Sequence, residues 1–307
     1  MVIPKMQVDA LLKDGGRITG IRAGGDEIGA RVTVIAEGVL GMLASAAGLR
    51  EAPAAAAHAL GYKEVIELSP GAIEDRWQLN PGEGAAHLFM GSITKGMMGG
   101  AFLYTNHDSV SLGMVIGMEQ LRRRPDELES WQLLDAFKAL PQIRPLLRGG
   151  VSGEYSAHAI AEGGIHALPR LAGDGYLLAG DVAGLALNAL ITVRGMDFAI
   201  ASGCFAARAI AAASRAGDLA SAAPAYEAAL RESFMLKDLN TAAAIPAIIE
   251  NPRLFTHYPQ AATAILTELF TVGPGPQRKL VSTALRGARK HFLNLDTLRD
   301  AISFRRI

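Results

Sequence analysis

The feature that most constrains the fold of this 307-residue chain is a short buried strand followed by Gly-Asp, a loop and a helix. Tyr176 to Ala179 is an uninterrupted apolar run, as in strands buried on both faces. Gly180-Asp181 ends this run, and the segment from Gly195 to Ala216 then has helical character and stops at Gly217. In an open α/β sheet, this order of elements predicts a ligand site at the carboxyl end of the strand.

The residues around this strand end have the chemistry of a ligand site. The helix would direct its partial positive charge and free backbone N–H groups towards a ligand. Asp181 would accept hydrogen bonds from sugar-like hydroxyls, and Gly184 and Gly195 would let the backbone approach a planar ring or a phosphate. The pattern alone leaves a second interpretation equally open, namely a glycine-rich packing turn capped by an Asp.

The N-terminal segment is predicted to form β-structure. Arg17 to Arg22 alternates apolar and polar residues, and the turn Gly24-Gly25-Asp26 reverses the chain. The β-branched run from Arg31 to Ala36 follows, so we expect a hairpin that leads into a buried strand. A short helix from Val39, closed by Gly48, comes next.

The middle of the chain, from 61 to 117, is predicted to be an antiparallel sheet domain. Lys63 to Leu68 alternates, and the runs Phe102 to Thr105 and Val110 to Val115 are separated by a turn at Asn106 to Ser109. A helix is expected to begin near Pro125, with an apolar side formed by Leu128, Leu134 and Phe137. From Ala222 onwards the chain is expected to be mostly helical.

Composition excludes several classes of protein. Lys plus Arg and Asp plus Glu both number 30, so net charge provides no bulk attraction to nucleic acid. The single cysteine, Cys204, cannot form an internal disulfide or ligate an iron–sulfur cluster by itself, and we expect it to be a packed thiol. The histidines lack metal-ligand spacing, so no metal site is predicted.

We expect a cytoplasmic protein, soluble or peripheral at the inner face of the membrane. The longest apolar stretch, Val182 to Val193, is broken by Asn188 and is shorter than the roughly 20 residues of a membrane span. The first residues have neither the charged nor the apolar region of an export signal.

Several long motifs resemble the electron transfer flavoprotein–quinone oxidoreductases, especially their FixC branch. Gly173 to Gly203, which reads GDGYLLAGDVAGLALNALITVRGMDFAIASG, is similar to the family's C-terminal flavin-binding motif. Ala30 to Leu49 resembles the strand and loop beside FAD, and Gly96 to Val115 resembles the hairpin of the substrate domain. Glu232 to Thr241 and Glu250 to Pro259 are similar to the C-terminal helices. The chain is therefore identified as a member of this family.

The resemblance implies an α/β, two-domain FAD enzyme. Its glutathione-reductase-like FAD-binding domain would be formed by residues 1–58 and 155–221 and would be N-terminally incomplete. An antiparallel β substrate domain would be inserted over 59–154, and 222–307 would form a C-terminal helical region.

The resemblance also implies which residues bind the cofactor. Asp181 would bind the ribityl chain, and the turn Arg194-Gly195-Met196 would lie at the isoalloxazine ring. Ala36, Glu37 and Gly38 would lie near the phosphate and ribose, and the implied set is completed by Gly180, Ala183, Gly184 and Asn188. Because FAD supplies the redox chemistry, no catalytic side chain is implied.

One departure from the family concerns the ADP half of the cofactor. Family members begin with a strand, turn and helix that carry G-x-G-x-x-G, and no such motif precedes the matched region here. We therefore expect poor FAD affinity and strand edges that lack partners. An N-terminally truncated, non-catalytic remnant stays open as an alternative, and the DNA upstream of Met1 would separate it from an enzyme with a longer reading frame.

The function implied by the resemblance is electron relay. Electrons would arrive from an electron transfer flavoprotein and leave through an iron–sulfur centre towards quinone or a ferredoxin-like acceptor. Since the chain has one cysteine, that cluster would belong to a separate small ferredoxin-like protein. The FixC branch is linked to nitrogen fixation and to catabolic operons, and the sequence does not choose between them. A geranylgeranyl-reductase-like flavoprotein is a further alternative, against which the segments LYTN (103–106) and KDLN (237–240) argue by resemblance.

Two further surfaces are candidates for binding. Met97, Met98 and Phe102 could line a quinone or acceptor pocket, although each is more simply a core residue of the β-domain. The segment from Arg278 to Ile307 contains eight Lys or Arg residues and two Asp residues, so its net charge is +6. Apolar residues in the same segment recur at helical spacing. Such a helix could dock an acidic ferredoxin-like protein or anionic lipid. The alternative is a solvated face over a packed helix.

Overall fold

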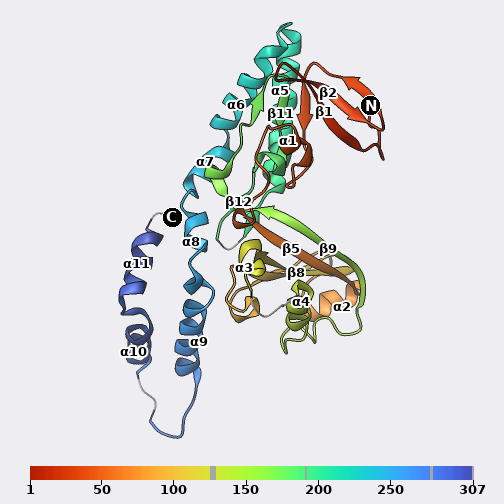
Figure 1. Ribbon diagram of the computed structural model, residues 1–307. Coiled ribbons are helices and arrows are strands. Elements are labelled where there is room, and N and C mark those ends of the chain that lie inside the picture. The colour runs from red at the N-terminus through yellow and green to blue at the C-terminus, as the bar shows by residue number, and fades with distance from the viewer. Residues whose placement is uncertain (125–128, 191, 277–278, 306–307) are drawn as a thin grey trace. The chain divides into compact units, whose positions relative to one another are not determined.

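The computed structural model describes residues 1–124, 129–190, 192–276 and 279–305 (Figure 1). They form two compact units. The first comprises Met1–His58 and Ala159–Pro246, and the second comprises Ala59–His158 and Ala247–Ile307. This division differs from the expected domains after residue 221, because α6 (Ala222–Glu232) and α7 (Phe234–Thr241) pack in the first unit.

Two sheets and a hairpin make up the β-structure of the first unit. The antiparallel sheet is β1 (Val8–Asp14), β2 (Arg17–Ala23) and β3 (Asp26–Gly29). The second sheet has the order β10 (Ala172–Gly173), β11 (Tyr176–Leu178), β4 (Thr33–Ile35). A hairpin joins β12 (Leu187–Asn188) to β13 (Val193–Arg194). The predicted hairpin is confirmed by β2 and β3, and the predicted strand after it is β4. The expectation that this strand is buried is wrong: β4 lies at the edge of its sheet, so Val34 is exposed and only Ile35 is buried.

The core of the first unit lies between β11 and the long helix α5 (Met196–Arg215). The three residues of β11 are buried, as its continuous apolar run predicts. Figure 1 shows α5 beside α6, and the Tyr226 hydroxyl of α6 donates to the Leu178 carbonyl of β11 at 2.7 Å. Small residues on α5 allow this close packing, and its buried face consists of Phe198, Ser202, Ala206, Ala209 and Ala213. The short helix α1 (Met42–Ala46) follows β4, as predicted.

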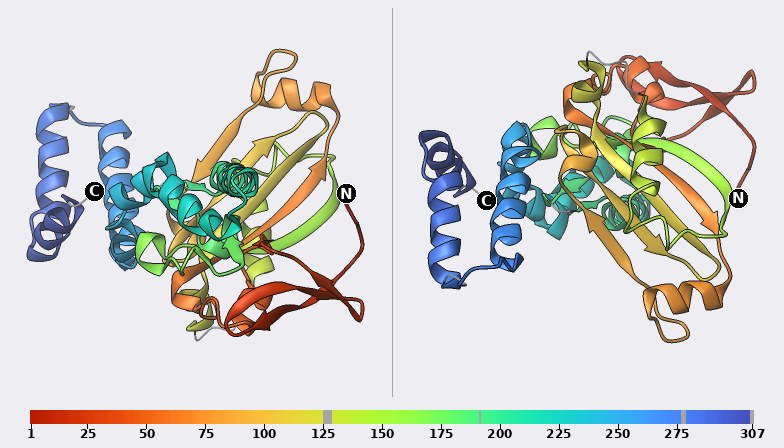
Figure 2. Two further views of the ribbon diagram at one scale, coloured as in Figure 1. Left: turned by 90° about the horizontal axis from the view of Figure 1, so that it is seen from above. Right: turned by 90° about the horizontal axis from the view of Figure 1, so that it is seen from below.

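The second unit is built on a five-stranded sheet with the order β6-β7-β8-β5-β9. These strands are β5 (His58–Glu67), β6 (Ala86–Phe89), β7 (Gly99–Thr105), β8 (Ser109–Gly117) and β9 (Val151–Ala161). Figure 2 shows the sheet with α2 (Pro70–Trp77, orange) at the end of the strands. Strands β6, β7, β8 and β5 pair antiparallel, which confirms the predicted sheet, and Asn106 N–H donates to Ser109 O in the predicted turn.

Helices cover this sheet and extend beyond it. α3 (Met118–Arg122) follows β8, and α4 (Ser130–Lys138) begins after a capping box formed by Glu129 and Gln132. The predicted apolar side is confirmed for Leu134 and Phe137, which are buried, whereas Pro125 and Leu128 lie outside the described residues. The C-terminal part is helical as predicted, with α8 (Ile245–Ile249), α9 (His257–Phe270), α10 (Leu280–Phe292) and α11 (Leu295–Phe304).

Candidate functional site

The carboxyl ends of β4 and β11 meet at one edge of their sheet. The two strands are parallel, with Ile35 opposite Leu178, and Ala179 N–H donates to Ile35 O at 3.0 Å. The loop at Ala36 and the loop at Gly180 therefore begin side by side. This juxtaposition follows from parallel pairing, since both chains leave the sheet in the same direction.

In the first loop, Glu37 is a helix cap. Its two carboxylate oxygens accept hydrogen bonds from Leu43 N–H at 2.8 Å and Ala44 N–H at 2.7 Å, at the start of α1. Ala36 is exposed beside it, and Gly38 has a φ of 82°, which favours glycine. The Glu37 carboxylate thus holds α1 in place, and the loop presents Ala36 and the Gly38 backbone at the sheet edge.

The second loop is attached to α5. Gly180 N–H donates to Ser202 Oγ at 2.9 Å, and Ser202 Oγ donates to Ala199 O at 2.9 Å. Ala183 is fully buried in the core, so it supports the loop from behind. Gly184 has a φ of 70° and its N–H donates to Asp181 O at 2.9 Å, which closes the short 3-10 turn Gly180–Ala183.

Asp181 and Gly195 are brought together. A Cβ on Gly195 would lie 3.7 Å from Asp181 Oδ1, so this carboxylate faces the start of α5. The N-cap residue of that helix, Gly195, has no side chain, and Met196 in the first turn is 85% exposed. A carboxylate acceptor and the N-terminal N–H groups of a 20-residue helix thus lie at one place.

The Arg194 guanidinium is hydrogen-bonded to carboxylates of the protein. Its guanidinium donates to Asp238 Oδ2 at 3.0 Å and to Asp197 Oδ2, and it lies 5.3 Å from the centre of the Phe198 ring. The hydrogen bonds that Arg194 donates to the Asp197 carboxylate raise the pKa of Arg194. Arg194 therefore fastens the start of α5 to α7, and a contact of its guanidinium with a ligand would have to form beside these bonds.

Asn188 is likewise engaged at both ends of its amide. Its Nδ2 donates to Glu162 Oε2 at 2.5 Å, and its Oδ1 accepts from Leu190 N–H at 2.7 Å. Asn188 therefore orients the β12–β13 hairpin that leads into Gly195.

Arg50 belongs to the site although sequence reasoning missed it. Its Nη1 donates to Val182 O at 2.8 Å and approaches Val39 O at 3.4 Å, so one side chain joins the two loops. Burial lowers the pKa of Arg50, and the neighbouring Glu37 carboxylate opposes this shift. Arg50 and Val182 are 132 positions apart, and no local pattern in the sequence signals such a contact.

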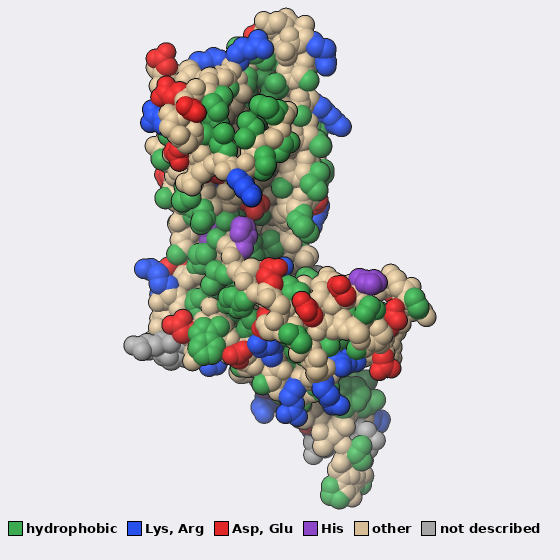
Figure 3. Space-filling view, turned by 90° about the vertical axis from the view of Figure 1, so that its right-hand side faces the viewer, with side chains coloured by type: hydrophobic (Ala, Val, Ile, Leu, Met, Phe, Trp, Pro, Cys, Tyr) green, Lys and Arg blue, Asp and Glu red, His purple; other side chains and the backbone are tan. Residues whose placement is uncertain are grey.

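The surroundings of the two loops are apolar. Leu40 and Met42 beside the first loop and Ile200 on α5 are exposed large hydrophobic side chains. Figure 3 shows hydrophobic side chains (green) on the surface of the N-terminal part of the first unit. Such exposed apolar groups around a few polar ones are typical of binding sites.

Cys204 is also exposed on α5, so the expectation of a packed thiol is wrong, since its position lies off the buried face of the helix.

Gly99 and Gly100 of the second unit are needed for strand pairing and do not form part of the candidate site. A Cβ on Gly99 would lie 1.8 Å from Val115 O, and one on Gly100 would lie 2.6 Å from Phe89 O. Both glycines are therefore required for strand pairing. Met97 is buried in the core, and the Phe102 ring stacks on Tyr104 with centroids 4.9 Å apart, so packing explains these two candidates for the acceptor pocket.

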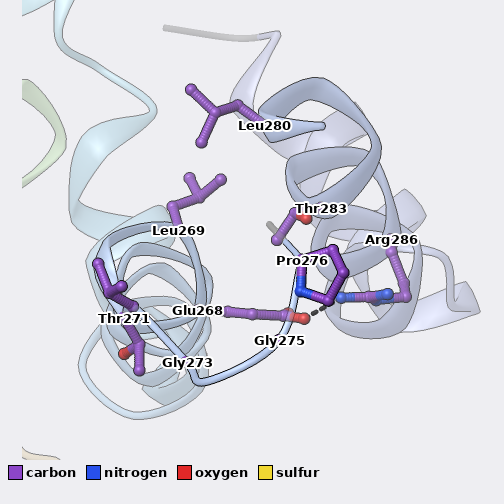
Figure 4. Close-up of a pocket in the computed structure, with 10 residues that line it drawn as sticks. Glu268, Leu269, Thr271, Gly273, Gly275, Pro276, Leu280, Thr283 and Arg286 are labelled. Carbon is purple, nitrogen blue, oxygen red and sulfur yellow. Dashed lines mark hydrogen bonds and ion pairs between the residues drawn. The ribbon is translucent and has the colours of Figure 1, made fainter. Parts of the chain in front are cut away.

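A hollow of about 230 Å³ lies between α9 and α10 (Figure 4). Glu268 and Arg286 on its wall pair with each other, and Leu269, Thr283 and Pro276 complete much of the lining. Because its two charged groups are mutually neutralised, the hollow offers mainly apolar and backbone groups. None of the predicted cofactor residues lies in it.

The fold is that of flavin-dependent oxidoreductases. A geranylgeranyl bacteriochlorophyll reductase-like protein from Thermoplasma acidophilum matches with a TM-score of 0.65 and 18% identity, over 96% of this chain and 69% of that one. The myxobacterial chondrochloren halogenase CndH, a variant of FAD-dependent halogenases, matches with a TM-score of 0.55 and 16% identity, over 99% of this chain and 69% of that one. At these identities the likeness shows the fold alone.

Sequence comparison identifies the family. The chain is 42% identical to the probable electron transfer flavoprotein-quinone oxidoreductase YdiS of Escherichia coli, over 98% of this chain and 70% of that protein. It is 40% identical to the protein FixC of the same organism, over 96% of this chain and 68% of that protein. Residues 58–160 match the ETF-QO ubiquinone-binding model, and 245–307 match the ETF-QO/FixC C-terminal domain. The chain belongs to the ETF-QO/FixC family of oxidoreductases, which confirms the resemblance.

Proposed function

We propose that this chain is an FAD-dependent oxidoreductase that relays electrons from an electron transfer flavoprotein towards quinone. The observation that carries the proposal is the meeting of Asp181 with the N-terminus of α5, where β4 and β11 both end. The name of the 42% identical relative, a probable electron transfer flavoprotein-quinone oxidoreductase, supports the donor and the acceptor. The match of 58–160 to a ubiquinone-binding model supports the quinone.

The residues of this edge fit a flavin by their chemistry. Asp181 would accept a hydrogen bond from a ribityl hydroxyl. The N–H groups of Gly195 and Met196, with the positive end of α5, would stabilise negative charge on a reduced ring. Ala36, Glu37 and Gly38 would border the ribose and phosphate side. FAD, when bound, supplies the redox chemistry, and the chain's own residues position it and set its electrostatic surroundings.

The onward acceptor is proposed to include a small ferredoxin-like iron–sulfur protein, because the single Cys204 cannot ligate a cluster. A role in nitrogen fixation rests on the resemblance to the FixC branch. The basic C-terminal helices are the proposed docking surface. Among the described residues there, Arg286 pairs with Glu268 and Arg299 with Asp296, whereas Arg289 and Lys290 have no ion-pair partner. Arg278 and Arg306 lie outside the described residues.

Charge reversal tests this surface. Replacing Arg289 and Lys290 by Glu is expected to weaken binding of an acidic ferredoxin about tenfold at low salt and to flatten its salt dependence, since two attractive charges become repulsive. Surface plasmon resonance at several salt concentrations measures both effects. Unchanged affinity and salt dependence would remove the C-terminal helices from the proposal.

The proposed location is the cytoplasm, with peripheral contact at the inner face of the membrane. In the described part of the chain, α5 is long and apolar enough to cross a membrane by length and composition. It packs Phe198, Ser202 and Ala206 into the first unit, as the core helix of a globular domain does.

The flavin site is tested at Asp181. FAD is titrated into the purified chain by fluorescence, and turnover is then measured with reduced electron transfer flavoprotein and a soluble ubiquinone analogue. Asp181→Ala is expected to raise the Kd for FAD about tenfold, because a half-buried hydrogen-bond acceptor for the ribityl chain is lost. Asp174→Ala, at the opposite end of β11, is the matched control and should leave the Kd unchanged.

Two alternatives are decided by the same titration. A chain that binds no FAD at any concentration would be the non-catalytic remnant. A geranylgeranyl-reductase-like activity is supported by fold likeness alone, at 18% identity, whereas the 42% identical relative is named as a probable electron transfer flavoprotein-quinone oxidoreductase. We therefore do not propose it.

A further inference from the structure

Glu162 is a buried acid for which the electron-relay function has no use. It follows β9 directly, its N–H donates to Ala57 O at 2.8 Å, and the residue is 4% exposed. Its Oε1 has no hydrogen-bond partner among the described residues. A buried carboxyl oxygen without a partner costs free energy when the group is charged, and less when it is neutral.

The other carboxyl oxygen is tied to the hairpin that leads into α5. Glu162 Oε2 accepts from Asn188 Nδ2 at 2.5 Å, and Asn188 Oδ1 accepts from Leu190 N–H at 2.7 Å. Leu190 has a φ of 72°, a conformation that a leucine adopts only when its surroundings hold it there. One continuous set of contacts therefore runs from Glu162 through Asn188 to the strained turn.

The surroundings of Glu162 determine its charge. Burial raises the pKa of Glu162 to about 7, and the hydrogen bond from Asn188 partly opposes this shift. The titratable groups on neighbouring elements are His58, His158 on β9, His166 in the 3-10 turn Gly164–Ala167, Arg194 on β13, and Lys237 and Asp238 on α7. Burial is the largest cause of the shift, and the Asn188 hydrogen bond opposes it.

We propose that Glu162 is a proton-binding site that positions the β12–β13 hairpin through Asn188. With the proton bound, a neutral carboxyl accepts the Asn188 amide and tolerates the apolar surroundings of Oε1. When the proton leaves to solvent, a buried anion with a single donor remains, and the hairpin shifts so that a water or a backbone N–H reaches the second oxygen. Glu162 is thus a positioning residue, and uptake of one proton accompanies the hairpin geometry seen here.

The consequence for electron transfer rests on the proposed function. The hairpin leads from Asn188 into Arg194 and Gly195, which we place beside the flavin. A change of charge at Glu162 would therefore alter the position of the α5 N-terminus relative to the ring, and would make flavin affinity depend on pH near neutrality.

The test follows the hairpin directly. In ¹⁵N–¹H spectra of the full chain without flavin, recorded from about pH 5 to about pH 9, the Asn188 side-chain amide and the Leu190 amide should shift in one step with a common midpoint. The midpoint should lie near the pKa of about 7 that burial sets for Glu162. Glu162→Gln, which keeps a neutral group of the same shape, should abolish the step. Glu154→Gln, an exposed acid on the same strand, should leave it unchanged.

A second variant separates proton binding from positioning. In Asn188→Ala, the Glu162 side-chain ¹³C signal should still titrate, with a higher midpoint because an opposing donor is gone, while the Leu190 step disappears. The proposal is overturned if the wild-type signals do not titrate, if the step persists in Glu162→Gln, or if Leu190 still titrates in Asn188→Ala. Because no flavin is present, a failed flavin titration leaves this result intact, and the reverse also holds.

Discussion

Glu162 in the first unit and Asp300 in the second are equally buried acids, each 4% exposed, and their pKa values are shifted in opposite directions. Asp300 on α11 accepts hydrogen bonds from Arg253 Nε at 2.7 Å, from Arg253 Nη2 and from the Tyr258 hydroxyl. These donors hold the pKa of Asp300 well below its usual range. Glu162 has one neutral donor, so burial dominates and raises its pKa to about 7.

The comparison shows that the donors around a buried acid, and not its burial alone, determine its charge. In the second unit, Asp300 is charged at neutral pH and joins α11 to Arg253 and to α9. In the first unit, Glu162 is left with an unpartnered oxygen and changes charge near neutral pH. One acid serves as an anchor, and the other is suited to respond to its surroundings.

The largest effect is expected from removing the anchor. Asp300→Ala leaves the Arg253 guanidinium without its partner and removes the acceptor of Tyr258, so the thermal transition of the second unit should fall by roughly 10 °C. Differential scanning calorimetry measures the change. Asp296→Ala on the same helix, whose carboxylate lies 3.8 Å from Arg299 at the surface, is the control and should shift the transition by less than about 2 °C. Equal shifts would mean that Asp300 is not an anchor.

The second effect is the pH dependence of the free energy of unfolding that Glu162 causes. Its folded pKa of about 7 lies above the value near 4.5 of an unperturbed Glu. Stability from this group is therefore fully present below about pH 4.5 and is lost as pH rises towards 7. Glu162→Gln lacks this loss. The difference in free energy of unfolding between the variant and the wild type should therefore increase by roughly 3 kcal/mol between about pH 4.5 and about pH 7, and should stay constant above pH 7.

Urea unfolding of both proteins at several pH values measures this gain. Parallel curves at all pH values would show that Glu162 titrates in the folded protein as an ordinary acid, and the contrast with Asp300 would be lost.

The smallest effect is expected from removing one of the hydrogen-bond donors to Asp300. Tyr258→Phe removes one donor from Asp300 and leaves Arg253 in place. The pKa of Asp300 is depressed, so its contribution to stability is present above about pH 4 and is lost as pH falls. With one donor fewer, this loss should begin at a higher pH, and the transition at neutral pH should fall by about 3 °C. Acid unfolding followed by circular dichroism measures the shift, and unchanged acid stability would assign the low pKa to Arg253 alone.

Sequence patterns predicted the elements that position the candidate site. The apolar run at Tyr176, the β-branched run at Arg31 and the small-residue helix after Gly195 are all found in place. Strands and helices are predictable because their side-chain period is local. The family was identified in the same way, through motifs continuous in the sequence, and relatives at 40–42% identity confirm it. The role of each cofactor residue stays a prediction.

Side-chain partners were not predictable. The sequence marks Glu37 and Arg194 as cofactor residues, but in the structure Glu37 caps α1 and Arg194 binds Asp197 and Asp238. Cys204 was expected to be packed, and the orientation of α5 exposes it. These outcomes depend on which face of a helix meets the core, a choice that a stretch of alanines does not specify.

By itself, the sequence determined the family, the order of strands and helices, and the place where two loops and a helix N-terminus come together. Tertiary structure alone decided that Arg50 binds Val182 across 132 positions, that Asn188 binds Glu162 across 26, and that Arg253 binds Asp300 across 47. The physical reason is range: backbone hydrogen bonding and side-chain period act over a few residues, whereas the partners of a buried charge are set by the path of the whole chain.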